Sequence, residues 1–160
     1  MNFIPNPLHP ALVHFPIALI LLGTLVAITA IFLRRWQLPQ ITACLLLLGA
    51  IGSVAATWSG EEDQEKIKLS PQAEQVMEEH EEWGERARNL ALLAAAGAVA
   101  SAVLGRFPKA CKGLAAVTAL AAVAASFCVL EAGHYGGKLV YEHGAGVGAS
   151  QNATPATDND

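Results

Sequence analysis

The chain has 160 residues, of which 53% are hydrophobic and 15% charged, and its mean hydropathy is +0.39. A soluble domain of this length would spread its charges along amphipathic elements, so the composition favours one membrane-embedded domain. The net charge of −4 offers no basic surface for nucleic acid, which we do not expect as a partner. Three cysteines without CxxC or CxxCH spacing argue against a cysteine zinc site or c-type haem attachment.

Four apolar segments predict an all-α membrane protein, a four-transmembrane up-and-down helix bundle in contact with lipid. We expect one domain over residues 1–143, followed by a disordered tail at 144–160 that is rich in Gly, Ala, Thr and Asp. The helices are expected at about 10–34, 38–60, 71–106 and 112–142. Small residues crowd the last two segments and would allow close packing within the bundle, and small-residue faces would also permit homo-oligomers.

The third helix is predicted to extend outside the membrane. Ser70 followed by Pro71 is typical of an N-cap with proline at the first helical position. From there a stripe recurs at alternating steps of four and three residues and continues into the membrane, which predicts that it faces the bundle. Its members are Val76, His80, Trp83, Ala87, Leu90 and Ala94.

Basic residues in the short loops predict the orientation. The first short loop carries Arg34 and Arg35, the other Arg106, Lys109 and Lys112, and neither contains an acid. The two sides carry equal numbers of basic residues, so their density in the short loops decides that these loops face the cytoplasm. We therefore expect a multi-pass protein of the bacterial inner membrane, with both termini and the acidic middle loop outside the cytoplasm.

All five histidines then lie at the outer end of the bundle: His9, His14, His80, His134 and His143. At 1.5 Å per residue, His14 and His134 fall in one layer and His80 and His9 several ångströms farther out. Imidazole is a frequent ligand of haem iron, zinc and copper, so the pattern predicts a one-sided metal or haem site. We rank His14 and His80 first, His134 and His143 next, and His9 last.

Two terminal motifs resemble the signatures of a bacterial membrane family, domain of unknown function 2231. They begin at His9-Pro10 (HPALVHFPIAL) and at Gly136-Gly137 (GGKLVYEHGAGV). The resemblance also covers the acidic end of the second helix and His80, and so spans nearly the whole chain. It implies a four-helix inner-membrane domain, in some relatives associated with iron–sulfur or cytochrome c modules, without a settled activity.

The leading hypothesis is a b-type cytochrome-like protein with one or two haem b groups, which passes electrons between membrane quinol and an extracytoplasmic redox protein. We expect an electron carrier or redox subunit rather than a stand-alone enzyme, and no catalytic residue is proposed. Gly136 and Gly137 would give a porphyrin room beside the backbone. Arg86 and Arg88 would pair with haem propionates, or would serve only as anchors at the membrane interface.

Two alternatives stay open. One is a non-haem zinc, copper or iron site that uses His14, His80, His134 and His143 as metal ligands. Glu131 and His134 form a Glu-x-x-His pair of the kind found in di-iron bundles, which Glu61 and Glu62 would help to complete. The other alternative is a membrane partner subunit without a cofactor.

Overall fold

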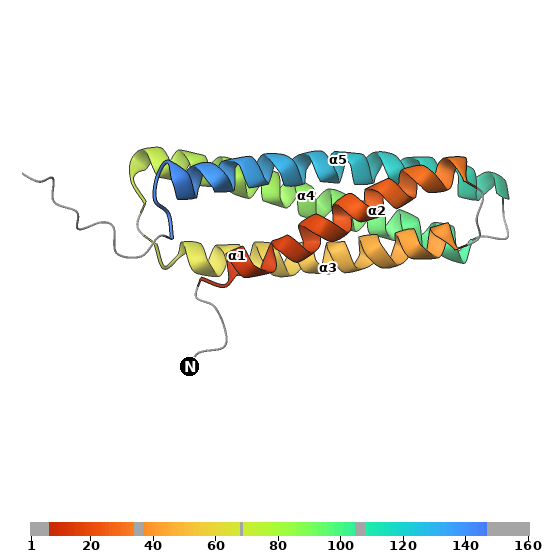
Figure 1. Cartoon of the computed structure of the whole chain (residues 1–160), viewed down its shortest axis with the longest axis horizontal. Coiled ribbons are helices and arrows are strands. Elements are labelled where there is room, and N and C mark those ends of the chain that lie inside the picture. The colour runs from red at the N-terminus through yellow and green to blue at the C-terminus, as the bar shows by residue number, and fades with distance from the viewer. Residues whose placement is uncertain (1–6, 34–36, 68, 105–107, 147–160) are drawn as a thin grey trace, which may run out of the picture.

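The computed structural model describes residues 7–33, 37–67, 69–104 and 108–146, and every regular element within them is an α-helix (Figure 1). A short α1 (His9–Leu12) leads into α2 (His14–Phe32), which is followed by α3 (Leu38–Gln64), α4 (Pro71–Val103) and α5 (Pro108–Tyr141). The four expected helices are therefore present, and the first is divided into α1 and α2. Arg34, Arg35, Arg106 and most of the expected tail lie outside the described residues.

Prolines determine where several helices begin. Pro71 follows Ser70, whose hydroxyl accepts the backbone N–H of Ala73 at 3.3 Å, as the sequence predicted. Pro16 has no N–H with which to bond the Leu12 carbonyl, and this missing bond separates α1 from α2. Val13 between them keeps helical dihedral angles of −63° and −29°, so the two pieces follow one path.

The four long helices form a ring in which α2 packs on α3, α3 on α4, α4 on α5 and α5 on α2. Small side chains let α4 and α5 approach closely: a Cβ built on Gly97 would lie 2.5 Å from the Thr118 hydroxyl oxygen. The predicted stripe on α4 does face the bundle, since Ala87 and Ala94 are buried and His80 is half-buried. This close packing holds α4 against α5.

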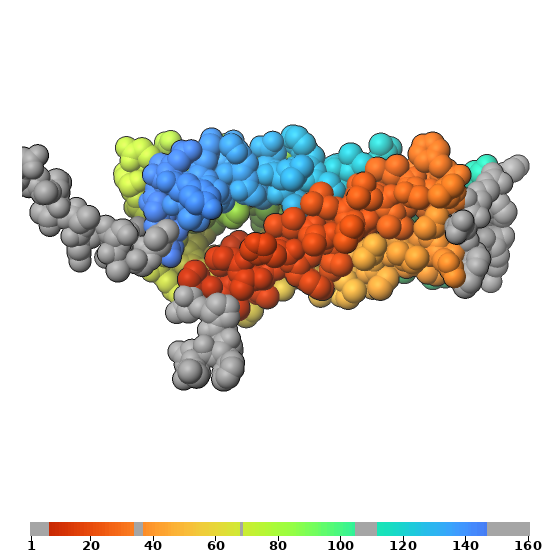
Figure 2. All heavy atoms as spheres, in the orientation of Figure 1, coloured from red at the N-terminus to blue at the C-terminus, as the bar shows by residue number. Residues whose placement is uncertain are grey.

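Helix α2 crosses the bundle at a slant (Figure 1). Its first turns lie against α3, where Gly52 meets Pro16 and Gly49 meets Ile20. Toward its other end it contacts α5, and the Thr24 hydroxyl bonds the Ala122 carbonyl at 3.0 Å and the Ser126 hydroxyl at 2.9 Å. Because α2 leaves α5 toward its N-terminus, the space-filling view shows a hollow between the two helices (Figure 2).

Large apolar side chains cover the outside of the bundle, as expected for a protein surrounded by lipid. Phe32 is 78% exposed and Leu120 is 70% exposed. Among the described residues, three helical segments are long and apolar enough to cross a membrane: His9–Phe32, which combines α1 and α2, Leu38–Gln64 and Lys112–Tyr141. Helix α4 differs from these segments because its first half is charged. Its second half nevertheless exposes Leu92, Leu93, Val99 and Val103.

Candidate functional site

A cavity of about 1600 Å³ occupies the end of the bundle at which α1 begins and α5 ends. All five helices contribute to its wall. Ile17, Ile20 and Val129 line the part nearest the middle of the bundle, while acidic and amide side chains, among them Asp63 and Glu81, line the outer part. Pockets for small ligands and cofactors measure about 300–1,000 Å³, so this cavity is large enough for a substantial organic group.

His9 is held on one side of the cavity by α3. Its Nδ1 lies 2.7 Å from the Ala56 carbonyl oxygen and 3.3 Å from the Ser59 hydroxyl. Gly60 packs against the ring: a Cβ there would lie 3.1 Å from two of its atoms. In addition, the Asp63 carboxylate accepts the backbone N–H groups of Leu8 and His9 at 2.8 and 2.9 Å. The carboxylate therefore caps the start of α1 and fixes the backbone that carries His9.

His80 is held in the same way on the opposite side, between α4 and α5. Its Nδ1 lies 2.8 Å from the Ala132 carbonyl oxygen, and a Cβ on Gly136 would lie 3.1 Å from its Cε1. Burial lowers the pKa of His80 below its ordinary value of 6.5, although the hydrogen bond to Ala132 acts in the opposite direction. This side chain is therefore a neutral imidazole at neutral pH.

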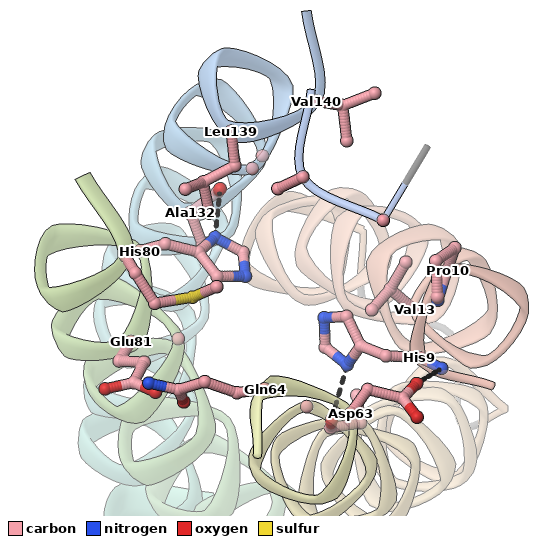
Figure 3. A pocket seen from close by; sticks show the side chains of 18 of the residues that line it. His9, Pro10, Val13, Asp63, Gln64, His80, Glu81, Ala132, Leu139 and Val140 are labelled. Atoms are coloured by element: carbon pink, nitrogen blue, oxygen red, sulfur yellow. Dashed lines mark hydrogen bonds between the residues drawn. The ribbon is translucent and has the colours of Figure 1, made fainter. Parts of the chain in front are cut away.

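The two imidazoles face each other across the cavity (Figure 3), with ring centres 6.0 Å apart and ring planes at 88°. A carbonyl oxygen only accepts hydrogen bonds, so the Nδ1 atom of each neutral ring carries the proton and donates it. The other nitrogen, Nε2, then keeps a free lone pair. In Figure 3 this nitrogen of each ring points into the space between them. The site thus presents two facing Nε2 atoms whose lone pairs are available to a metal ion.

Gln64 and Glu81 lie beside this pair on the outer wall (Figure 3). Burial raises the pKa of Glu81 above its ordinary value, and a hydrogen bond from Gln64 partly opposes the shift. Lys66 also contributes to the wall and forms an ion pair with Asp63 at 3.2 Å. The rim of the cavity is therefore polar and mainly acidic, in contrast to its apolar inner part.

The structure distributes the other predicted histidines around this pair. His14 is exposed at the cavity wall, and its Nδ1 lies 2.8 Å from the Pro10 carbonyl oxygen. His143 is half-buried and also reaches the wall, in the turn that follows α5. His134 lies on an exposed face of α5 away from the cavity, where its ring meets Tyr135 edge-on with centres 5.5 Å apart.

The predicted glycine and arginine residues have different surroundings. Gly136 makes room for the His80 ring, whereas a Cβ on Gly137 would meet nothing within 4 Å, although Gly137 lines the cavity. Arg86 pairs with Glu82 at 2.6 Å and lies over the Trp83 ring, outside the cavity wall. Arg88, also outside the wall, lies 3.3 Å from Glu85 and 3.5 Å from the Thr57 hydroxyl.

Sequence reasoning missed the groups that hold the two facing rings. These are Asp63, Gly60 and the carbonyl oxygens of Ala56 and Ala132, and all of them reach their histidine from another helix. Among the described residues, no three His, Cys, Asp or Glu side chains come together at a point where they would hold a metal ion. The Glu131–His134 pair in particular lies away from the cavity wall.

Comparison with known proteins assigns the chain to a family. No curated protein and no solved structure gives a significant match to the chain. A family model described as a predicted membrane protein, DUF2231, matches residues 5–149, which include both terminal motifs and all five histidines. The chain is therefore a member of the DUF2231 family of membrane proteins.

Proposed function

We propose that this membrane protein binds haem b between His9 and His80 and serves as an electron carrier. The observation that carries the proposal is the facing of the two imidazoles, each fixed at Nδ1 by a backbone carbonyl and free at Nε2. A histidine pair of this kind would hold the iron of a haem b, as histidines do in b-type cytochromes. When bound, such a group supplies reversible one-electron transfer.

The spacing of the rings fits this role. Metal–imidazole bonds of about 2.0 Å and an imidazole radius of about 1.1 Å place two opposed ring centres about 6 Å apart. The ring centres of His9 and His80 are 6.0 Å apart. Gly60 and Gly136 support the same reading, because side chains at these positions would crowd the two rings. The cavity volume of about 1600 Å³ also leaves space for a porphyrin.

The carbonyl groups that accept the Nδ1–H bonds would set the orientation and the basicity of the two imidazoles. A hydrogen bond from Nδ1–H to a carbonyl fixes the tautomer and the ring orientation, and it raises the basicity of the coordinating nitrogen. His9 has this bond to Ala56 and His80 has it to Ala132. The lowered pKa of His80 favours the role as well, because a ligand must be neutral to bind a metal, and burial keeps this side chain neutral. The contacts with Ala56 and Ala132 fix the orientation of both rings, which supports the proposed role.

We further propose that all four long helices cross a bacterial inner membrane, with the cavity on the outer side. The apolar residues exposed on the second half of α4, such as Leu93 and Val103, support a fourth crossing. The basic residues of the two short loops support the orientation. In this arrangement the site faces the extracytoplasmic side, where it would exchange electrons with a redox protein, while lipid-soluble quinol reaches it from the membrane.

The absorption spectrum of detergent-purified protein tests the haem proposal. We expect a Soret band, sharp visible bands on reduction and one haem per chain. His9→Ala and His80→Ala should each abolish the low-spin spectrum, whereas His134→Ala is a matched control that should retain it, because His134 lies outside the cavity wall. A near-perpendicular ligand pair should also give a strongly anisotropic low-spin ferric resonance.

Other results would reject the proposal. Colourless protein that contains stoichiometric zinc, copper or iron would favour a non-haem metal site. Protein with neither haem nor metal, and with unchanged stability in the two alanine variants, would favour a partner subunit without a cofactor.

A further inference from the structure

The cavity opens sideways between α2 and α5. The two helices meet at Thr24, whose hydroxyl bonds Ala122 and Ser126 on α5, and from there they diverge toward the histidine end of the bundle. The hollow visible in Figure 2 lies between these diverging segments. We call it the portal. The Thr24 contact limits the depth of the portal, because from Thr24 toward the opposite end of the bundle α2 lies against α5.

The sides of the portal are apolar or small. Val13, which precedes α2, contributes on one side with Ile17 and Ile20 of α2, and Val129, Gly133 and Gly137 contribute from α5. All six lie in the two segments His9–Phe32 and Lys112–Tyr141, which are apolar enough to cross a membrane. A side opening of this composition, at membrane depth, would admit a hydrocarbon chain from the lipid without burying an unpaired polar group.

His14 offers a hydrogen-bond acceptor at the cavity wall beside the portal. Its Nδ1 is engaged with the Pro10 carbonyl oxygen at 2.8 Å. This bond leaves Nε2 as the acceptor of the neutral ring. A hydroxyl group that enters along the portal would therefore reach an imidazole nitrogen at the cavity wall.

Charge at the rim indicates what kind of headgroup fits. Glu61, Glu78 and Glu81 line the outer cavity, and the cation Lys66 is already paired with Asp63. Carboxylates repel a phosphate group, so an anionic phospholipid head would be unfavourable here. An uncharged head that carries hydroxyl groups would not meet this penalty.

We propose that the portal binds a lipid-soluble quinol, whose ring hydroxyl bonds Nε2 of His14 and whose isoprenoid tail leaves between α2 and α5. A role of the bound quinol in electron transfer rests on the proposed function. The binding itself depends on the portal and on His14, so it can be tested in protein without haem.

Photolabelling with an azidoquinone, followed by peptide mapping, tests the proposal on the full chain in lipid nanodiscs. We expect labelled peptides from the segments around Ile17 and Gly133, and competition by decylubiquinol. Gly133→Leu should lower the labelling at least tenfold, because a Cβ there meets nothing within 4 Å and the larger side chain would fill the portal. His14→Ala should lower it about three- to tenfold through the lost hydrogen bond.

Gly113→Leu is the matched control. Gly113 lies on the same helix, outside the cavity wall, and a Cβ there also meets nothing within 4 Å, so its labelling should equal that of the unmodified chain. Equal labelling of the Gly133→Leu and Gly113→Leu variants would overturn the proposal. A co-purified phospholipid that only Gly133→Leu displaces would overturn it as well. Because haem absorbance is measured separately on the same samples, the failure of one proposal does not imply failure of the other.

Discussion

The carboxylate of Asp63, at the end of α3, accepts the backbone N–H of His9 at 2.9 Å, at the start of α1. The same oxygen accepts the N–H of Leu8 at 2.8 Å. First-turn N–H groups of a helix have no partner within the helix, and a carboxylate there satisfies them and interacts favourably with the helix dipole. One side chain thus connects α3 to the segment that aims the His9 ring at His80.

Replacement of Asp63 should therefore affect both stability and the position of His9. Asp63→Ala removes this acceptor and with it both hydrogen bonds, and we expect the free energy of unfolding to fall by about 1 kcal/mol. Asp63→Asn keeps an acceptor oxygen and should lose less. Haem content should follow the same order, with the alanine variant lower. Glu62→Gln is the control, because Glu62 is exposed and makes no such bond. Equal effects of Asp63→Ala and Glu62→Gln on thermal unfolding would contradict this role.

Acidification should destabilise the protein without haem through His80. Because its folded pKa lies below 6.5, the unfolded chain binds more protons than the folded protein as the pH approaches and passes below 6.5. The free energy of unfolding should thus decrease as pH falls through 6.5 and continue to fall until the folded pKa is reached. Thermal melts between pH 5 and 7.5 measure this slope.

The His80→Asn variant isolates the contribution of that histidine. Asparagine can still donate to the Ala132 carbonyl but does not titrate in this range. The raised pKa of Glu81 contributes a slope of opposite sign and is itself influenced by His80, so both curves are measured in a Glu81→Gln background, which removes this contribution. Curves of equal slope would show that His80 is not protonated on unfolding in this range.

Adjacent glycines on α5 should respond differently to alanine. A Cβ at Gly136 would lie 3.1 Å from the His80 ring, which its bond to Ala132 holds in place, so Gly136→Ala should be destabilising by about 1–3 kcal/mol. At Gly137 a Cβ meets nothing within 4 Å, and Gly137→Ala should be neutral or stabilising by up to about 1 kcal/mol. Chemical unfolding and haem content measure both effects. A stabilised Gly136→Ala variant would show that the imidazole moves without penalty.

Much of the fold could be predicted from local patterns. Ser70–Pro71 marks the beginning of α4, and the stripe through Ala87 and Ala94 marks the side that faces the bundle. These features depend on residues near one another in the chain, so sequence spacing is sufficient to read them. The division at Pro16 was not predicted, although a proline in the second turn of the expected helix removes a backbone hydrogen bond and so favours such a break.

The sequence predicted at which end of the bundle the histidines lie, but not which face of each helix turns toward the cavity. A helix turns about 100° per residue, so His14 points about 140° away from His9, and only one of them can face His80 directly. Similarly, His134 lies about 200° from Gly136, which faces His80. Which face turns inward depends on how α1 and α5 pack on other helices, for example through Asp63, and this long-range contact leaves no local pattern.

Topology reporters should test the four crossings. Alkaline phosphatase fused after residue 146 should be active, because we place this end outside the cytoplasm, and green fluorescent protein fused there should be dark. Fusions after Val103 should show the opposite pattern, because α4 would have returned the chain to the cytoplasm. The same activity pattern at both positions would mean that α4 and α5 do not cross as separate spans.

Loss of the contact between α2 and α5 should loosen the inner limit of the portal. Thr24→Val keeps the shape of the side chain but removes the contacts with the Ala122 carbonyl and the Ser126 hydroxyl, together with the bond to the Ile20 carbonyl within α2. Hydrogen bonds between membrane helices contribute about 0.6 kcal/mol on average, with a maximum of about 1.7 kcal/mol. We therefore expect a loss of about 1 kcal/mol in Thr24→Val and a smaller loss in Ser126→Ala, measured by reversible unfolding in detergent.

The double variant separates a shared interaction from independent effects. Because Thr24 and Ser126 bond each other at 2.9 Å, the loss in the double variant should be smaller than the two single losses combined. Thr29→Val is a control on the same helix, since the Thr29 hydroxyl bonds only the Leu25 carbonyl within α2 and should show no coupling to Ser126. Additive losses for Thr24 and Ser126 would mean that α2 and α5 are held together by packing alone at this level.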